Sequence, residues 1–279
     1  MNKKNKSVIC ILGIVLVGLI VFINMNYKSD NLKYNSEEYP EYVKNTEINE
    51  EFFESLGEKQ TILFKILNSI DFYNTAKGSF ITKNMKTNEE TGYKFEVNIL
   101  NKMLKVESKE NLIIIQNNVK YEINKENMQY RKFEIEDISL DENIGKLKPK
   151  DRIIGKKDKE FISRPESQYL LIVNKILLNE ELGISLLNND NWELNNSKKY
   201  LNRDTVEIKR RLGFTGKSGE NNINVLVDKK NGTILKEEIF DRDNKIIFST
   251  EVKEIEFNKK INDDFLKEYE NLDKYKLVE

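Results

Sequence analysis

The sequence contains no histidine, and its one cysteine, Cys10, lies near the amino terminus. Histidine has the ordinary pKa closest to neutral pH, and many hydrolases use it as general base or zinc ligand. Its absence excludes Ser-His-Asp and Cys-His catalysis, and it also excludes zinc sites of the usual histidine-rich kind. Carboxylate chemistry and Ser-Lys pairs are the enzyme mechanisms that remain open.

An excess of charge of either sign is also lacking. Lys and Arg number 46 and Asp and Glu number 47, which gives a formal net charge of -1. A chain without a strong positive field has little attraction for phosphate backbones, so we expect no nucleic-acid partner. Because no cysteine follows Cys10, disulfides cannot stabilise the remainder of the chain, and a hydrophobic core must do so.

One long apolar run is present, at the amino terminus. It covers residues 7–24, carries no charge, follows three lysines and has about the length that crosses a bilayer. Positive residues stay on the cytoplasmic side, and no small-residue cleavage site follows the run, so we predict an uncleaved signal anchor. The predicted order is a cytoplasmic tail at residues 1–6, a transmembrane signal anchor at 7–25, a polar tether at 26–45, and an extracytoplasmic domain at 46–279.

This apolar run has two other interpretations. A cleaved signal peptide is the alternative, because the run is at the short end of the spanning range. A lipid anchor is disfavoured, because Cys10 lies near the start of the run and a lipoprotein cysteine follows it. The prediction is therefore a single-pass protein of the cell membrane, with most of the chain on the outer side.

The apolar spacing changes from helical to strand-like along the domain. Between Thr46 and Ile70 it is mostly helical, which predicts one amphipathic helix, or two shorter ones if Gly57 interrupts it. After Phe72 the period becomes two, in short runs rich in β-branched and aromatic residues. These runs predict strands at residues 78–83, 93–100, 103–108, 112–116, 119–124 and 130–135.

The turns between these strands are short. Asn101-Lys102 and Asn117-Asn118 fit two-residue hairpins, so adjacent strands should be antiparallel. A later hairpin has Asn231-Gly232 at its turn, a pair that supplies the two positive φ angles of a type I′ turn. The strand patterns of this second half lie at residues 205–211, 223–228, 233–240 and 246–257.

A second helix is predicted after Pro165, and its apolar side must be buried, most simply against the sheet. The connector before it, residues 140–160, mixes lysines with acidic residues; we interpret it as a solvated loop, with a contact to anionic lipid or wall polymer as the alternative. Trp192 is expected to fill part of the core. Since strands and helices do not alternate, the predicted class is α+β, with an antiparallel sheet of about ten or eleven strands.

The candidate sites in the sequence are weak. A turn at Asp241-Arg242-Asp243-Asn244-Lys245 has a lysine where a calcium loop needs an oxygen ligand. Residues 213–219 contain Lys217 and Ser218 but lack the glycine spacing of a phosphate loop and precede a strand. Acidic residues are so numerous that close pairs arise freely, and solvated faces explain them. The pairs are Glu134 with Glu136 and Asp137, Asp141 with Glu142, Asp241 with Asp243, Glu254 with Glu256, and Asp263 with Asp264.

We therefore predict no catalytic residue, no cofactor-binding residue, no metal ligand and no cofactor. The carboxylate pairs keep a glycosidase-like mechanism open, because sequence spacing cannot tell whether two carboxylates face one cleft.

The last third of the chain contains a recognisable series of turn and core positions. They are 225–228, Asn231-Gly232, 235–238, Asp241, Asn244-Lys245, 252–255, 258–261 and Asp264-Phe265. A strand ending in Asp turns through a Gly, a second strand and a polar turn follow, and an Asn-x-x-Ile-x-x-x-Phe tail closes the domain. This pattern resembles the LolA/LolB/RseB-like superfamily, and the resemblance covers about residues 46–270.

Within that superfamily the chain looks most like the germination lipoproteins of GerS type from anaerobic spore formers. The resemblance implies a curved antiparallel half-barrel with helices on its concave side, no catalytic residues, and a binding role in the spore envelope. Proteins of that type assist an N-acetylmuramoyl-L-alanine amidase. The sequence departs from them in having no lipobox cysteine.

These observations predict a non-enzymatic, membrane-tethered binding protein with an envelope protein, such as that amidase, as its partner. One alternative is a lipid or lipoprotein carrier or sensor that holds an apolar ligand in the hollow of the half-barrel. The other is a carboxylate-dependent cell-wall hydrolase.

Overall fold

The computed structural model describes residues 50–136, 144, 147–154, 160–187, 189–195, 198–211, 220–262, 264–267 and 272–278. The predicted tail, anchor and tether lie outside these residues, as does the glycine-containing segment 213–219. Among the described residues, no helix has both the length and the apolar character needed to span a membrane.

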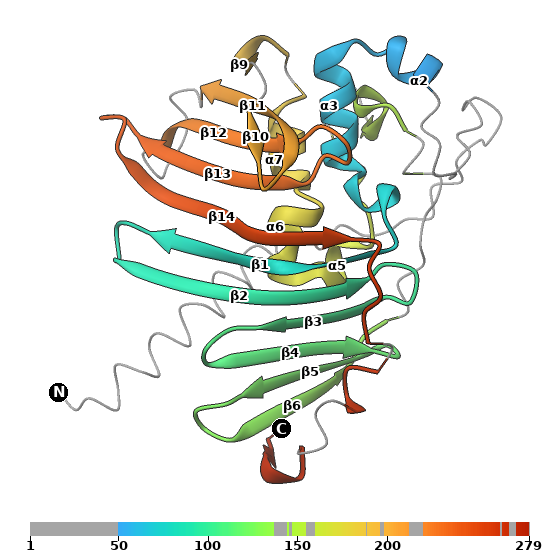
Figure 1. The fold of residues 1–279 in the computed structure, drawn as a ribbon, viewed down its shortest axis with the longest axis vertical. Coiled ribbons are helices and arrows are strands. Elements are labelled where there is room, and N and C mark those ends of the chain that lie inside the picture. The colour runs from blue at the N-terminus through green and yellow to red at the C-terminus, as the bar shows by residue number, and fades with distance from the viewer. Residues whose placement is uncertain are drawn as a thin grey trace. The chain divides into compact units, whose positions relative to one another are not determined.

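A 13-stranded sheet dominates the described residues, in the order β10-β11-β12-β13-β14-β1-β2-β3-β4-β5-β6-β15, with β9 also paired to β11 (Figure 1). A separate two-stranded sheet joins β7 (Ile153–Ile154) to β8 (Glu160–Phe161). The strands of the large sheet are β1 Thr75–Asn84, β2 Glu89–Asn98, β3 Met103–Glu107, β4 Asn111–Gln116, β5 Val119–Asn124, β6 Gln129–Glu134, β9 Trp192–Asn195, β10 Lys199–Tyr200, β11 Arg203–Arg211, β12 Glu220–Asp228, β13 Ile234–Asp241, β14 Ile246–Phe257 and β15 Lys276–Leu277.

The sheet has more strands than the sequence predicted. All ten predicted strands are present, and β9, β10 and β15 add three short ones, so the expected number of about ten or eleven was too low. The sheet is antiparallel except at one edge, where β15 pairs with β6 in the parallel direction. These additions have two to four residues each, too few to show a period.

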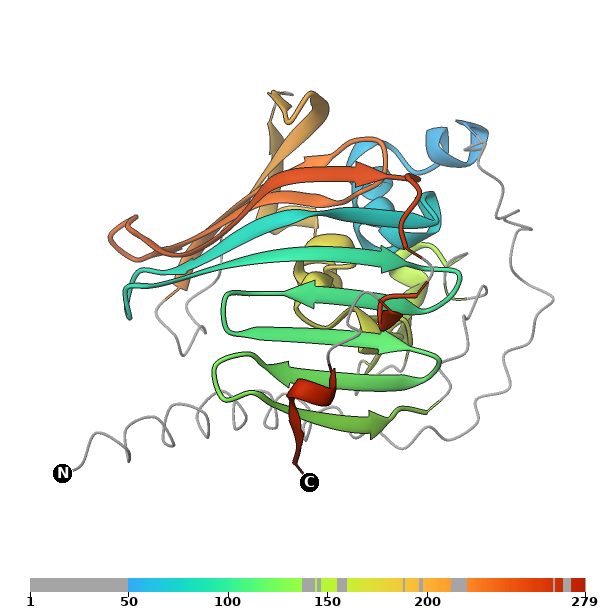
Figure 2. The same cartoon turned by 60° about the horizontal axis from the view of Figure 1, so that its bottom comes forward.

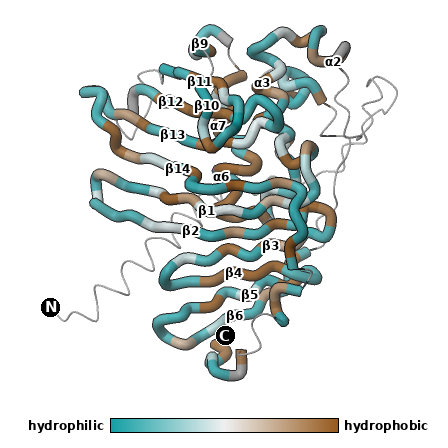
Figure 3. Tube along the Cα trace, in the orientation of Figure 1, coloured by the Kyte–Doolittle hydropathy of each residue, from teal (hydrophilic) through white to brown (hydrophobic). Residues whose placement is uncertain are grey.

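Alternation of side chains divides the sheet into two faces. On β2, Phe95 and Val97 are buried, while Lys94 and Glu96 on the other face are not. Figure 3 shows the same exchange of hydrophilic and hydrophobic positions along the strands. Successive side chains of a strand point to opposite faces of the sheet, so an alternating pattern of burial means that one face packs against the core.

The turns confirm one predicted hairpin and correct two. Asn117 and Asn118 have φ angles of 53° and 58°, as the two-residue hairpin between Gln116 and Val119 requires. The turn at Asn101-Lys102 is longer, because the pairing stops at Asn98 and Met103, and only Lys102 of that loop has a positive φ.

The predicted type I′ turn at Asn231-Gly232 is also wrong. Gly232 alone has a positive φ, of 78°, and its N–H donates to the Asp228 carbonyl at 2.8 Å. Asp228 Oδ1 accepts a further bond from the Lys230 N–H at 2.8 Å, so the aspartate side chain shapes the turn. A Cβ at Gly232 would lie 2.1 Å from the Lys65 carbonyl carbon, which fits this turn tightly against a helix.

The helices are shorter than the periodicity suggested. Gly57, with φ 72°, separates α2 (Glu50–Glu54) from α3 (Glu58–Leu67), so the two-helix alternative is the one observed. The region after Pro165 is a series of short helical turns and not one helix. Leu171 ends α5 with a positive φ of 50°, and Asn179 begins a new helix by capping the Leu182 N–H. Its elements are α5 Ser167–Leu170, η4 Leu171–Val173, α6 Asn174–Leu177 and α7 Glu180–Ser185, and the remaining single turns are η2 Ser69–Phe72, η3 Pro149–Arg152, η5 Asn189–Asn191 and η7 Leu272–Lys274.

The helices pack on one face of the sheet, behind it in Figures 1 and 2. One core cluster joins the chain from α5 to α6 to strands β1–β4 and β14, and another joins α3 and α7 to β9 and β11–β13. Trp192 is 2% exposed in the second cluster, so the prediction that it fills the core is confirmed. The opposite face, called the open face below, carries no helix in the described residues except single turns of the C-terminal segment.

Candidate functional site

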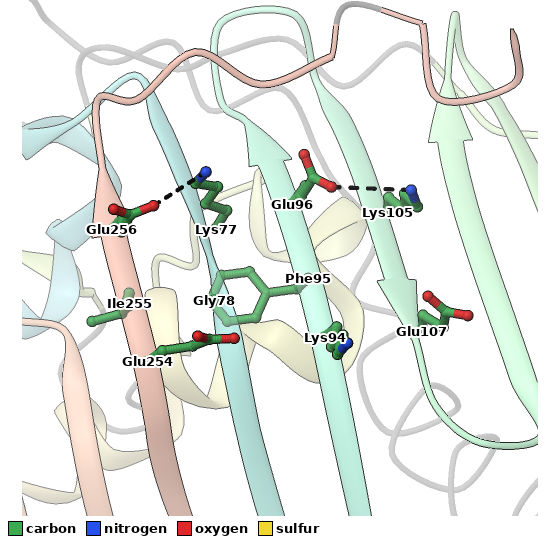
Figure 4. Close-up of a pocket in the computed structure, with 10 residues that line it drawn as sticks. All are labelled: Lys77, Gly78, Lys94, Phe95, Glu96, Lys105, Glu107, Glu254, Ile255 and Glu256. Atoms are coloured by element: carbon green, nitrogen blue, oxygen red, sulfur yellow. Dashed lines mark ion pairs between the residues drawn. The ribbon is translucent and has the colours of Figure 1, made fainter. Parts of the chain in front are cut away.

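A charged groove of about 340 Å³ lies on the open face, over β14, β1, β2 and β3 (Figure 4). Most of its side chains are long and charged, whereas Phe95 belongs to the core cluster beneath the sheet and Ile255 packs against that cluster. The residues that line this open-face groove are Lys77, Gly78, Lys94, Phe95, Glu96, Lys105, Glu107, Glu254, Ile255 and Glu256.

Strand register arranges these charges in alternating rows. Lys77 lies opposite Glu256 on β14 and Glu96 on β2, and Glu96 lies opposite Lys105 on β3. Lys77 Nζ is 3.1 Å from a Glu256 carboxylate oxygen, and Lys105 Nζ is 4.0 Å from Glu96. Directly opposed charges of opposite sign stabilise a sheet, although such exposed pairs contribute only about 0–1 kcal/mol each.

Gly78 brings the two halves of the groove floor together. A Cβ at this position would lie 2.2 Å from the Glu254 carbonyl oxygen, closer than any side chain tolerates. The register between β1 and β14 shifts immediately afterwards, between Ser79 and Phe80. A glycine at a close backbone approach next to a bulge explains why the charged rows of β14 and β1 meet.

The β10–β11 hairpin borders the groove on one side, since it folds over the open face (Figure 1). The Tyr200 hydroxyl donates to the Val252 carbonyl oxygen at 2.9 Å and lies 3.1 Å from a Glu251 carboxylate oxygen. Burial, followed by the charge of Glu251, raises the pKa of Tyr200 to about 12, so the hydroxyl keeps its proton at neutral pH. The Arg203 guanidinium adds a contact 4.7 Å from the Phe257 ring.

The C-terminal segment borders the groove on the other side. Phe265 is fully buried against the open face of β3–β5, and Lys105 Nζ lies 6.0 Å from its ring. Gln116 secures the segment by accepting from the Phe265 N–H at 3.0 Å and donating to Asp264 at 3.1 Å. The groove therefore lies between the hairpin and the C-terminal segment, and its lining comes from the four strands.

A basic surface continues from the groove along the strands. This basic surface forms a second groove of about 470 Å³, which shares Lys94 and Glu107 with the first. Lys125 pairs with Glu107, and Lys253 pairs with Glu251 at 2.7 Å. The hydrogen bond from Lys253 is the main reason that the pKa of Glu251 is lowered. The lysines of this surface are Lys94, Lys109, Lys125 and Lys253.

Side chains fill the space between the sheet and the helices. Tyr169, Leu170 and Val173 are at most 1% exposed and pack against the core of β1–β4 and β14. A cleft of about 430 Å³ opens beside α6 and α7, but apolar Ile239 and Phe248 share it with charged Lys175, among other residues of both kinds. An apolar ligand would have to share this space with charged groups.

The predicted acidic pairs fall in separate places. Glu254 and Glu256 lie together in the open-face groove, and both are exposed, as a solvated face requires. Asp241 Oδ1 accepts from the Asp243 and Lys245 N–H groups, so the Asp241–Lys245 segment is a β-turn.

Other members of these pairs have structural roles or lie outside the described residues. Asp264 accepts from the Lys267 N–H and from Gln116, which lowers its pKa. Glu134 is exposed at the end of β6, whereas Asp137, Asp141, Glu142 and Asp263 lie outside the described residues. Within the described residues, no group of three or more acidic or thiol side chains could hold a metal ion.

A buried ionic network under the helices was missed by the sequence prediction. Arg152, expected in a solvated loop, is 0% exposed and donates to Glu180 at 3.1 Å. The Arg164 N–H donates to the same Glu180 oxygen at 2.8 Å, and the Arg164 guanidinium pairs with Asp71 and Glu166. The network ties η2, η3 and α7 together, and only Pro149, Ile153 and Ile154 next to Arg152 hinted at burial.

Burial shifts the pKa values of this network. It raises the pKa of Glu180 to about 7, against the Arg164 N–H bond and the charge of Arg152. It lowers the pKa of Arg152 to about 10. Burial alone would also lower the pKa of Arg164, but the charges of Asp71 and Glu166 raise it instead. The network lies under the helices, away from the open face, and serves the packing of the domain.

Comparison with known proteins gives no family assignment. No family model matches the sequence, and no curated protein matches it. A structure of an uncharacterized conserved protein from Thermus thermophilus is similar with TM-score 0.43 and 11% identity, covering 78% of this chain and 97% of that one. The MucA/MucB complex of Pseudomonas aeruginosa gives TM-score 0.39 and 10% identity, with coverages of 79% and 64%.

A putative outer membrane lipoprotein-sorting protein domain from Vibrio parahaemolyticus gives TM-score 0.24 and 13% identity, with coverages of 70% and 89%. None of the three names concerns germination. Because each of these TM-scores is below 0.5, the functional argument rests on the geometry of the chain itself.

Proposed function

We propose that this chain is an extracytoplasmic binding protein whose open-face groove engages a polar surface or segment of a protein partner. The charged groove over β14, β1, β2 and β3 supports this proposal above all other features. Its exposed rows of Lys and Glu suit a polar partner, because complementary charges give specificity and orientation more than raw affinity.

The finer proposal takes the partner to be an envelope enzyme. The resemblance to germination lipoproteins suggests an N-acetylmuramoyl-L-alanine amidase that acts on spore-cortex peptidoglycan. The predicted anchor at residues 7–25 would hold the domain on the outer side of the membrane. Both statements derive from the sequence.

Capture of the partner by the tagged full chain from sporulating cells tests the proposal. Lys94 lines the groove, lies between Ser79 on β1 and Glu107 on β3, and also belongs to the adjoining basic surface. We expect Lys94→Glu to reduce recovery of an envelope enzyme by about tenfold or more, since like charges across an interface are strongly unfavourable. Lys230→Glu, an exposed change in the β12–β13 turn, is the matched control. Recovery of no envelope enzyme by the unaltered chain would contradict the proposal.

The carrier alternative is less well supported by this geometry. A carrier needs an open apolar hollow, and the corresponding space is occupied by Tyr169, Leu170 and neighbouring side chains. The cleft beside α6 and α7 is lined in part by charged groups.

A carboxylate-dependent hydrolase is the second candidate, because the groove contains four glutamates. Glu256, Glu96 and Glu107 each pair with a lysine, whereas a general acid needs an apolar setting that keeps its proton. Release of sugar or peptide from purified peptidoglycan by the chain alone, abolished in Glu254→Gln, would establish this second candidate and displace the first.

A further inference from the structure

Strand β6 forms an edge of the large sheet that is only partly covered. On one side all six of its residues pair with β5. On the other side, β15 is the one strand of the described residues that pairs with β6, through Lys276 opposite Gln129 and Leu277 opposite Tyr130. Among the residues that the structure describes, so short a strand leaves 131–134 of β6 without a neighbour on this side.

The backbone of β6 indicates where a strand would add. The Lys276 N–H donates to the Met128 carbonyl and the Val278 N–H to the Tyr130 carbonyl, both at 2.9 Å. Because successive residues of a strand direct their backbone groups to alternate sides, Lys132 is the next residue that faces outward. In the described part of the chain, no backbone hydrogen bond reaches its N–H or carbonyl on that side.

Exposed apolar side chains gather at the same edge. Met128 and Phe133 are each 42% exposed, and Leu277 is 54% exposed. They are three of the seven large hydrophobic residues that are exposed in the described chain, and the others lie on turns or on α7. Apolar side chains on an unpaired edge favour association with another chain.

Charge selects the kind of strand that fits. Arg131 and Phe133 lie on one face of β6, and Lys132 and Glu134 on the other. A strand beside them would therefore place acidic groups near Arg131 and Lys132 and an apolar group near Phe133. Extended segments in which two acidic residues precede an apolar one match this edge.

We propose that β6 accepts an extended, acidic and apolar segment of the partner protein by strand addition, and that β15 competes with this segment for the edge. The proposal rests on the proposed function, because it names a second contact of the same partner. The main-chain bonds would give affinity, and the side-chain pattern would give selectivity. The presence of β15 demonstrates that the edge takes a strand in the parallel direction.

Two proline substitutions have opposite expected effects. Lys132→Pro removes the outward N–H without touching a bond to β5, because prolines are tolerated on edge strands whose N–H faces solvent. Val278→Pro removes the donor that holds β15 on Tyr130. The probe is a labelled short peptide of repeated glutamate-glutamate-valine, measured by fluorescence anisotropy against the full chain in detergent.

The predicted changes are a loss of affinity of about tenfold in Lys132→Pro and a gain of about fivefold in Val278→Pro, each the effect of one hydrogen bond. Lys132→Ala keeps the N–H and should lose less than Lys132→Pro. A peptide with lysine in place of glutamate should bind at least tenfold more weakly.

Equal peptide binding by Lys132→Pro and Lys132→Ala would overturn the proposal. The proposal would also be overturned if the peptide bound neither the unaltered chain nor any of the variants. Partner capture separates this outcome from the proposed function. If Lys132→Pro captures the envelope enzyme as well as the unaltered chain does, the edge is not a contact, yet the groove remains one.

Discussion

Glu180 is a buried carboxyl at the meeting point of two arginines, and its environment gives it an unusual titration. Its pKa in the folded protein is about 7, compared with an ordinary value of 4.5. Between these two pH values the folded state holds a proton that the unfolded state has released, so folding stability falls as pH rises through this window. Above about pH 7 this contribution becomes constant.

We expect Glu180→Gln to remove this pH dependence. The free energy of unfolding of the unaltered protein should fall between pH 5 and pH 8 by up to about 3 kcal/mol more than that of the variant. Urea unfolding at the two pH values measures the difference. Glu181→Gln, an exposed neighbour, should leave the pH profile unchanged. Parallel profiles for Glu180→Gln and the unaltered chain would show that Glu180 is ionised throughout.

Single residues were the hardest level to predict from the sequence. Asp71, Arg152 and Glu180 belong to distant segments, and no local pattern distinguishes them from the many exposed charges around them. Glu254 and Glu256 were correctly expected on a solvated face. The register of β1 with β14 and with β2 places these two glutamates beside Lys77 and Lys94. This register depends on the bulge after Gly78.

Strands and their immediate hairpins were the most predictable elements. Period-two runs with polar turns identify β1–β6 and β11–β14, because one face is buried and the pattern repeats over five residues or more. The helices and the shortest strands depend on tertiary contacts. Asn179 divides what periodicity presents as one helix, and β15 exists only because β6 lies beside it.

The C-terminal segment offers a test at the level of an element. Gln116 makes both side-chain hydrogen bonds that join this segment to β4, through the Phe265 N–H and Asp264. We expect Gln116→Met to lower the hydrogen-exchange protection of the Phe265 amide by about tenfold, the effect of about 1.4 kcal/mol. Gln168→Met, at an exposed site on α5, should leave it unchanged. Unaltered protection in Gln116→Met would mean that packing of Phe265 alone holds the segment.

At the scale of the whole molecule, the pairing of β1 with β14 unites two parts of the chain. Strands β1–β6 and β9–β14 each follow one another locally, and β1–β14 is the junction between them. The close approach of Gly78 to Glu254 lies within that junction. Pairings so distant in sequence slow folding, because loop entropy must be lost before the contact forms.

We expect Gly78→Ala to destabilise the whole domain by about 2 kcal/mol or more, since the Glu254 carbonyl cannot move away without breaking the pairing. Trp192 fluorescence and far-ultraviolet circular dichroism should report one shared transition, although Trp192 lies in the other half of the sheet. Gly92→Ala, where an added Cβ meets nothing within 4 Å, should change stability by less than about 1 kcal/mol. Two separate transitions would show that the halves fold independently.

The Tyr200 hydroxyl joins the β10–β11 hairpin to Glu251 and Val252 on β14. The same strand supplies Glu254 to the groove. A bound molecule that attracts the Glu251 carboxylate must weaken the contact between this carboxylate and the Tyr200 hydroxyl. Because such coupling is reciprocal, a molecule that binds the hairpin also changes the affinity of the open-face groove beside it. The β10–β11 hairpin is thus coupled to the groove. Mutations at Tyr200 would change the affinity of the groove for a bound molecule without removing a contact to that molecule.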